Sequence, residues 1–212
     1  MLNDLPGLPN GATPIAIERT DDPRIAAFRD IKERDLTGRH GKFIVEGTVV
    51  LRMLAAAHKI GGDFRAECIL ILKNRLAGVL DILSEFPADV PVYVAKAEVL
   101  DTIVGFHLHR GILALGVRVG SRDRAQTIAS LPETSLVVAG CGLSNHDNMG
   151  AMFRNAAAFM ADAVFLDSTS CDPLYRKALR VSVGSVLSVP YHRSGDALSM
   201  LEALANEGFE IW

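Results

Sequence analysis

Apolar runs alternate with helical patterns along the first part of the chain. Four short apolar runs lack helical spacing and predict buried strands; they lie at residues 43–45, 67–73, 90–94 and 111–117. Three stretches between them carry apolar residues at helical spacing; these are residues 47–59, 75–86 and 96–104. Gly61 and Gly62 end the first of these helices. The order predicts a compact α/β unit.

A second unit with the same alternation follows. Its predicted strands lie at residues 135–139 and 163–166, with the start of another at 209–212. Its predicted helices lie at residues 150–161, from about 174 with a break near 184, and at 196–206. Strands that alternate with helices imply a parallel sheet covered on both faces. We therefore expect an α/β fold throughout.

A polar stretch from Gly120 to Arg124 has no apolar periodicity, as expected of a domain linker. The resulting division is an N-terminal extension at 1–20, a first domain at 21–118, a linker at 119–132 and a second domain at 133–212.

The composition is that of an ordinary globular protein, with 49% hydrophobic and 22% charged residues. No apolar run approaches the roughly 18 residues of a membrane span, and the first ten residues lack the features of a secretory signal. Cys68, Cys141 and Cys171 are far apart and outside any CxxC pair, which argues against disulfides and zinc. We expect a cytoplasmic protein without a membrane partner.

The net charge of -3 and the pI of about 6.1 count mildly against nucleic acid as a partner. A local basic patch can still bind phosphate when the total charge is acidic. The stretch from Arg19 to Lys42 is not a basic arm, because its acidic residues nearly cancel its basic ones.

Polar residues follow the strand at 135–139, where α/β proteins usually bind ligands. Asn148, Gly150 and Arg154 stand at the predicted start of the next helix, so an amide and a guanidinium there could orient a phosphate or a ribose oxygen. The alternative is an ordinary helix with Asn148 as its N-cap and Arg154 in solvent. A dinucleotide site is a further alternative, but Asn145 occupies the third glycine position of GxGxxG.

The pattern N-x-G-x-x-x-R at residues 148–154 resembles the first motif of the SpoU/TrmH ribose 2′-O-methyltransferases of the SPOUT superfamily. Three further segments resemble that family in the same order: RHGKFIVEG at 39–47, HRGILA at 109–114 and KALRVSVG at 177–184. The resemblance runs from about residue 22 to residue 212.

This resemblance implies an L30e-like substrate-binding domain followed by a parallel-sheet SPOUT domain with a C-terminal knot. It also implies S-adenosyl-L-methionine as cofactor, rRNA or tRNA as substrate and a homodimer. Arg154 and Asn148 then fall on the family's functional positions. Guanidinium stays protonated and is a poor base, so Arg154 is expected to hold a phosphate or to stabilise the developing alkoxide.

Candidate RNA contacts come from two sources. Arg176, Lys177 and Arg180 share one predicted helix with few acids nearby, although a solvated helix face is an equal alternative. Family resemblance alone adds Arg39, His40, Lys42 and Arg110. The pair His107 and His109 has no third ligand candidate, so we expect no metal site.

The sequence departs from the family after residue 208. The family continues through G-x-E-x-x-G and S-L-N-x-S segments, which build most of the cofactor pocket and the knot, and neither occurs here. We therefore expect a C-terminally truncated domain that binds S-adenosylmethionine weakly, and its cofactor-binding residues stay unknown. The alternative function is a non-catalytic RNA-binding module.

Overall fold

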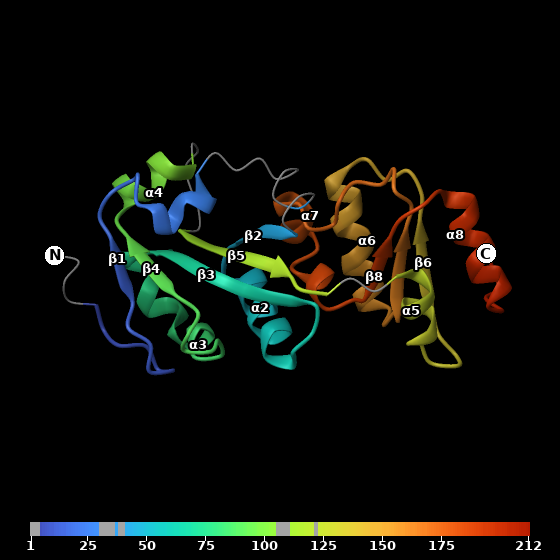
Figure 1. Cartoon of the computed structure of the whole chain (residues 1–212), viewed down its shortest axis with the longest axis horizontal. Helices are drawn as coiled ribbons and strands as arrows, with labels where there is room; N and C mark the ends of the chain where they lie inside the picture. The colour runs from blue at the N-terminus through green and yellow to red at the C-terminus, as the bar shows by residue number, and fades with distance from the viewer. Residues whose placement is uncertain (1–4, 30–36, 38–40, 105–110, 121–122) are drawn as a thin grey trace. The chain divides into compact units, whose positions relative to one another are not determined.

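The computed structural model describes residues 5–29, 37, 41–104, 111–120 and 123–212, with the backbone alone for 101–104. The chain divides into two compact units, Met1–Gly120 and Ser121–Trp212 (Figure 1). Among the described residues, no helix combines the length and apolar character needed to cross a membrane.

The first unit is built on a mixed sheet in the order β1-β4-β3-β5-β2. β1, β4 and β3 are parallel, and β5 runs antiparallel to both β3 and β2. The strands are β1 (Ile15–Ile17), β2 (Lys42–Glu46), β3 (Phe64–Leu72), β4 (Val92–Ala95) and β5 (Ile112–Arg118). The helices are η1 (Pro23–Phe28), α2 (Thr48–Ile60), η2 (Lys73–Val79), α3 (Leu80–Leu83) and α4 (Ala97–Val104).

Both faces of this sheet are buried, which explains why its strands are nearly continuous apolar runs. Leu70 of β3 packs in one core cluster with Phe28 of η1 and Leu100 of α4. Its neighbours Ile69 and Ile71 are also fully buried, and the two-residue period of a strand directs them to the opposite face.

Two features of this unit differ from the expectation. Ile15 to Ile17, expected within an N-terminal extension, pair in parallel with β4; three residues are too few to give a periodic signal. The expected helix at 75–86 is a 3-10 helix followed by the short α3, because Val79 leaves the helical region at φ -134° directly after Gly78.

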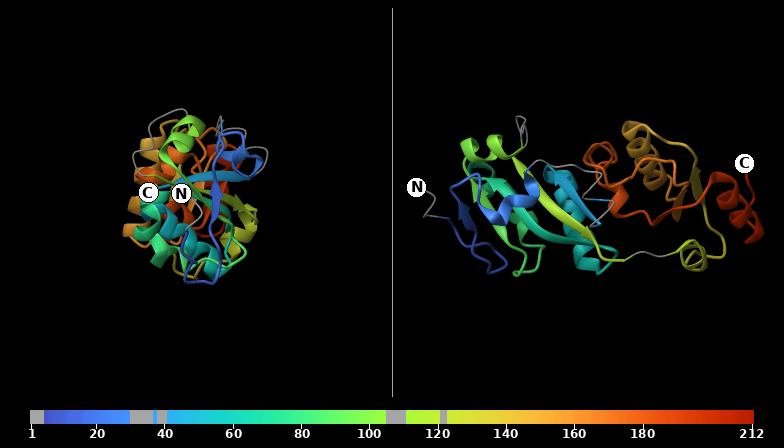
Figure 2. Two further views of the ribbon diagram at one scale, coloured as in Figure 1. Left: turned by 90° about the vertical axis from the view of Figure 1, so that its left-hand side faces the viewer. Right: turned by 45° about the horizontal axis from the view of Figure 1, so that its top comes forward.

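The second unit contains a parallel sheet in the order β6-β7-β8, which confirms the expected α/β fold with a parallel sheet. Its strands are β6 (Val137–Gly140), β7 (Ala163–Leu166) and β8 (Tyr191–Arg193). Its helices are α5 (Arg124–Ala129), α6 (His146–Ala158), α7 (Arg176–Val181), η3 (Ser185–Leu187) and α8 (Ala197–Asn206). α6 and α8 lie on opposite faces of the sheet (Figures 1 and 2), and Met200 of α8 packs with Phe165 of β7.

The expected linker contains a helix. Asp123 and Gln126 form a reciprocal capping box that starts α5, and Thr127 is buried. The guanidinium of Arg124 donates to the carbonyls of Ser199 at 2.8 Å and Ser194 at 3.3 Å, so α5 is fixed to the β8–α8 region. The capping box was a sequence signal for this helix, but the polar composition of the stretch led to its interpretation as a linker.

The expected strand at 209–212 is not present. Instead, α8 ends in a Schellman motif in which Phe209 N–H donates to Leu204 O at 3.1 Å and Gly208 N–H to Ala205 O at 3.0 Å. Gly208 has φ +88°, and Phe209 packs against the core cluster of the second unit. β8, by contrast, was missed because Tyr191–Arg193 is short and mostly polar.

Replacing Met160 by glycine is expected to raise the free energy of unfolding by about 1 kcal/mol. Met160 ends α6 at φ +56°, a left-handed conformation that disfavours a side chain, and it is 84% exposed, so little packing is lost. Urea denaturation measures the gain. Met160→Ala is the control, because it removes the side chain and keeps the backbone strain; an equal gain in both variants would contradict this explanation.

Candidate functional site

Three parallel strands of the second unit end at one edge of the sheet. Gly140, Leu166 and Arg193 are the last residues of β6, β7 and β8. The loops that follow them are bonded to one another: Cys171 N–H donates to Leu143 O at 2.7 Å, and Ser168 N–H donates to Gly195 O at 2.8 Å. This carboxyl edge is where parallel α/β sheets usually bind ligands.

The carboxylate of Asp167 holds these loops together. Asp167 follows β7 and is 4% exposed. It accepts hydrogen bonds from Gly142 N–H at 3.1 Å, from Thr169 Oγ1 at 2.6 Å, and from both Ser170 N–H at 3.0 Å and Ser170 Oγ at 2.6 Å. Burial raises the pKa of this carboxyl, but the four hydrogen bonds outweigh burial and lower the pKa to about 2.

This low pKa predicts a loss of stability in acid. The folded pKa of about 2 lies below the ordinary value of 3.8. At pH values above 3.8, ionised Asp167 therefore stabilises the fold by about 2 kcal/mol. This contribution decreases as the pH falls from 3.8 towards the folded pKa. Asp167→Asn should remove this contribution. Urea denaturation near neutral pH and near pH 3 measures it, and an equal acid sensitivity of both proteins would contradict the prediction.

The helix α6 begins earlier than expected and with a different cap. Asn145 is its N-cap, and its side-chain oxygen accepts from Asp147 N–H at 2.7 Å and from Asn148 N–H at 3.2 Å. The alternative in which Asn148 caps the helix is therefore wrong. Asn148 lies in the first turn instead, with its side chain exposed. Asn145 follows a strand-end loop, which is the usual place of a cap.

Asn148 and Arg154 lie on different sides of α6. Six residues of α-helix turn by about 600°, which places the two side chains about 120° apart and about 9 Å along the axis. Asn148 lines an apolar groove, whereas Arg154 is four residues after Gly150 and so lies about 40° from the side that packs on α7. A single chain therefore does not bring the amide and the guanidinium together at one point.

The groove beside Asn148 has a volume of about 570 Å³ and is mostly apolar. It is lined by Leu136, Val138, Leu143, Asn148, Ala151, Met152, Asn155, Ala156 and Phe159. Phe159 is 75% exposed and Leu136 52% exposed. The amides of Asn148 and Asn155, seven residues apart on α6, are polar side chains in this lining.

The helices α6 and α7 approach closely at Gly150. A Cβ atom there would lie 2.7 Å from both the Ala178 carbonyl oxygen and the Val181 Cβ. At their amino ends, the rings of His146 and Tyr175 lie 4.8 Å apart, and Lys177 forms an ion pair with Asp147 at 2.6 Å. The glycine of the N-x-G-x-x-x-R pattern thus serves helix packing.

The residues expected to contact RNA are divided between the two units. Lys177 is paired with Asp147, which corrects the expectation that few acids lie near this helix. Arg180 is exposed and Arg176 half-buried, both on α7. Lys42 is in the other unit, where its ammonium pairs with Glu67 at 2.8 Å. Arg39, His40 and Arg110, and the histidines at 107 and 109, lie outside the described residues.

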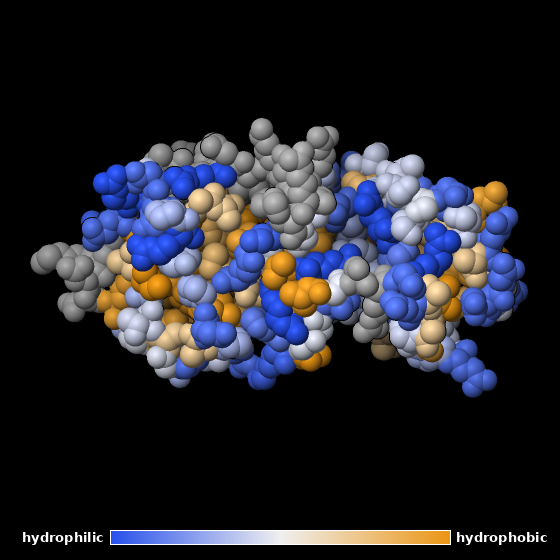
Figure 3. All heavy atoms as spheres, viewed as in Figure 1, coloured by the Kyte–Doolittle hydropathy of each residue, from blue (hydrophilic) through white to orange (hydrophobic). Residues whose placement is uncertain are grey.

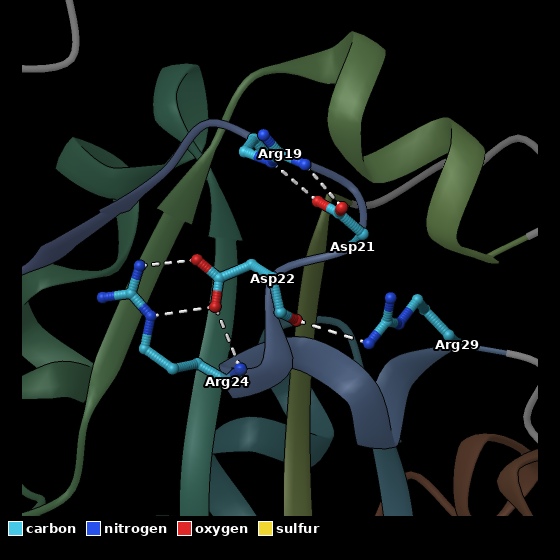
Figure 4. A network of polar contacts seen from close by, with 5 residues as sticks. All are labelled: Arg19, Asp21, Asp22, Arg24 and Arg29. Carbon is cyan, nitrogen blue, oxygen red and sulfur yellow. Dashed lines mark hydrogen bonds and ion pairs between the residues drawn. The ribbon is translucent and has the colours of Figure 1, made fainter.

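The N-terminal arginines of the first unit are paired with neighbouring acids (Figure 4). Arg24 bonds to the carboxylate of Asp22 at 2.6 and 2.9 Å, and Arg19 to that of Asp21 at 2.6 and 2.9 Å. Hydrophilic residues gather around this segment on the face seen in Figure 3. The local pairing agrees with the near cancellation of charge in the sequence, and such exposed pairs add little stability.

Sequence reasoning missed the two residues that organise the carboxyl edge. Asp167 received no separate role from the sequence, and in the structure its oxygens bond within the protein. The signal was available, because an Asp followed by Ser and Thr at a strand end favours side chain–backbone turns. Asn145 was weighed only as the position that breaks a glycine pattern.

Comparisons with known proteins agree across both units. The SpoU rRNA Methylase family matches residues 135–212. An uncharacterized tRNA/rRNA methyltransferase of Mycobacterium tuberculosis is 36% identical over 195 residues, which are 90% of this chain and 64% of that protein. This chain therefore spans less than two thirds of that relative's length.

Two solved structures share the fold. An S-adenosylmethionine-bound rRNA methyltransferase from Sinorhizobium meliloti gives a TM-score of 0.63 at 20% identity, over 88% of this chain and 67% of that one. An RNA 2′-O ribose methyltransferase gives 0.64 at 22% identity, over 91% of this chain and 70% of that one. The match of residues 135–212 places the second unit in the SpoU rRNA Methylase family, and the solved structures share the fold over most of the chain.

Proposed function

We propose that this chain serves the S-adenosylmethionine-dependent methylation of a ribose 2′-hydroxyl in rRNA or tRNA. The observation that carries the proposal is the position of Asn148 and Arg154 on α6, which begins at the carboxyl edge of the parallel sheet within the family-matched segment. The mycobacterial relative is named a tRNA/rRNA methyltransferase, and one structural neighbour a 2′-O ribose methyltransferase.

The residues of this chain supply binding and charge stabilisation. S-adenosylmethionine, when bound, supplies an electrophilic methyl group. Arg154 is exposed, and among the described residues it has neither an ion pair nor a hydrogen-bond partner, so its guanidinium is available for a phosphate or for the developing alkoxide. Asn148 offers an amide donor and an acceptor for substrate. Because these two side chains are about 120° apart, they contact different parts of the reacting complex.

In this proposal the first unit, as an L30e-like domain, binds the substrate. The candidate phosphate contacts are Lys42 of the first unit and Arg176 and Arg180 of the second. Arg180 supports this role through its exposure on α7. Lys177 and Lys42 are weaker candidates, because a phosphate would have to compete with Asp147 and Glu67, respectively. A homodimer belongs to the proposal on family grounds alone, and sedimentation of the chain tests it.

A methyl-transfer assay tests the function. The chain is incubated with S-adenosylmethionine carrying a labelled methyl group and with bulk rRNA or tRNA, and the RNA is digested to nucleosides for mass spectrometry. Label on a 2′-O-methylnucleoside supports the proposal, and label on a base overturns the ribose assignment. Calorimetry with the cofactor, on this chain and on the mycobacterial relative, accompanies it. RNA binding without cofactor binding or transfer would favour the non-catalytic module.

A further inference from the structure

One buried carboxylate lies at the centre of the loops that present the candidate site. Asp167 is 4% exposed and accepts four hydrogen bonds, from Gly142, Thr169 and twice from Ser170. Three of these bonds end on Oδ1 and one on Oδ2, and the side chain is almost fully buried, so it is placed to hold the loops rather than to contact a substrate. Its effect on a bound ligand must therefore pass through the loops that it holds.

Those loops lead directly into α6. Asp167 fixes Gly142, and Ser170 Oγ, itself bonded to Asp167, accepts from Leu143 N–H at 3.1 Å. The carbonyl of Leu143 accepts from Cys171 N–H at 2.7 Å. Asn145, the N-cap of α6, follows Leu143 by two residues. The path of the chain into the first turn of α6 is thus set by contacts that converge on one carboxylate.

The third strand is connected to the same loop. Arg193, the last residue of β8, donates from Nε to Ser170 O at 2.8 Å and from Nη2 to Ser168 O at 3.0 Å. Removing the carboxylate would leave the donors of Gly142 and Ser170 without their acceptor in a largely buried site. An unsatisfied buried donor destabilises a fold more than the loss of both partners of a hydrogen bond does.

We propose that Asp167 is a positioning residue of this site. It holds the loops after β6 and β7 in register and thereby fixes the first turn of α6, which presents Asn148, and the helix that carries Arg154. The functional part of this proposal, an effect on RNA, rests on the proposed RNA methylation, because that function gives Asn148 and Arg154 their roles. The structural part, the holding of the loops, does not rest on it.

Hydrogen exchange of backbone amides tests the structural part. In Asp167→Asn, the amide oxygen can still accept, but the charge-assisted bonds become weaker neutral ones, so the amides of Gly142, Leu143 and Ser170 are expected to exchange about tenfold faster relative to Phe165 in the β6–β7 ladder. The amide resonances of Asn145 and Asn148 should shift as well. Exchange of these loop amides within about twofold of wild type would overturn the proposal.

The matched control is Asp162→Asn at the other end of β7. Asp162 accepts from Leu136 N–H at 2.8 Å, so this variant weakens a similar charge-assisted bond away from the carboxyl edge and should leave Gly142 and Leu143 unchanged. A uniform acceleration of all amides in Asp167→Asn would mean a purely stabilising role and would also overturn the proposal. If Asp167→Asn does not fold, Ser170→Ala removes one donor to Asp167 and the acceptor of Leu143, with the same amides expected to respond.

An RNA-binding measurement tests the functional part. Fluorescence anisotropy with a labelled oligoribonucleotide should give a weaker affinity for Asp167→Asn than for Asp162→Asn. If the wild-type chain binds no RNA, the proposed function fails while the exchange experiment still decides the positioning role. If both variants bind as tightly as wild type while the loop amides respond, the loops are held by Asp167 but do not orient the RNA contacts, and the functional part is rejected.

Discussion

Replacing Gly150 by alanine is expected to lower the free energy of unfolding of the second unit by about 2 kcal/mol. The added Cβ would lie 2.7 Å from Ala178 O, 2.7 Å from Val181 Cβ and 3.0 Å from Ser182 N. Two of these three atoms belong to the backbone of α7 and its C-cap, so no side-chain rotation relieves the clash. On an exposed helix the same change would stabilise by about 1 kcal/mol, so the sign of the effect is itself diagnostic.

Urea denaturation followed by circular dichroism measures this change. Gly78→Ala is the matched control, because nothing lies within 4 Å of the Cβ it would add, and its stability should equal or exceed that of wild type by up to about 1 kcal/mol. A stabilised Gly150→Ala variant would show that α6 and α7 do not approach as closely as described. The destabilised outcome would assign the glycine of the N-x-G-x-x-x-R pattern to helix packing, separately from the chemistry of Arg154.

Replacing Arg154 by lysine is expected to reduce methyl transfer about 100-fold. The positive charge remains, but the planar guanidinium with its parallel donors is lost, and that geometry is what holds a phosphate or an alkoxide in two directions. Because Arg154 is exposed and, among the described residues, bonded to none, the substitution should leave the fold intact. The loss should appear in kcat, with RNA affinity changed only slightly if Arg154 acts in the transition state.

The measurement is the turnover of labelled methyl groups under saturating RNA. Arg52→Lys is the control, since Arg52 is an exposed arginine on α2 of the other unit, paired with Asp81 at 2.8 Å, and its turnover should match wild type. Near-normal turnover in Arg154→Lys would reject the two-donor role. A loss confined to KM would instead place Arg154 among the ground-state RNA contacts.

The sequence was informative where a local signal and the tertiary structure agree. The alternation of apolar runs and helical patterns predicted the α/β fold and the parallel sheet of the second unit, because a strand buried on both faces must be apolar throughout. The N-x-G-x-x-x-R pattern located α6 and its family because the pattern is contiguous. The helix expected at 196–206 agrees with α8, which ends just before Gly208, where a left-handed residue favours glycine.

Only the tertiary structure decided how the residues of the site relate to one another. That Asn148 faces a groove while Arg154 lies near the α7 side follows from the true start of α6 and from its packing at Gly150. The pairing of Lys177 with Asp147 joins residues 30 positions apart. Such contacts leave no periodic trace in a sequence, because they depend on how separate elements pack.

Asp167 is the clearest example of a residue whose role the sequence alone does not decide. Its type and its place after a strand suit either a nucleotide contact or a loop anchor, and the choice depends on which donors surround it. Those donors come from residues 142, 169 and 170, and the first of them is 25 positions away. The sequence determined the family, the sheet and the helix that carries the functional pattern. The packing of three strand-end loops around one buried carboxylate decided how that helix is held.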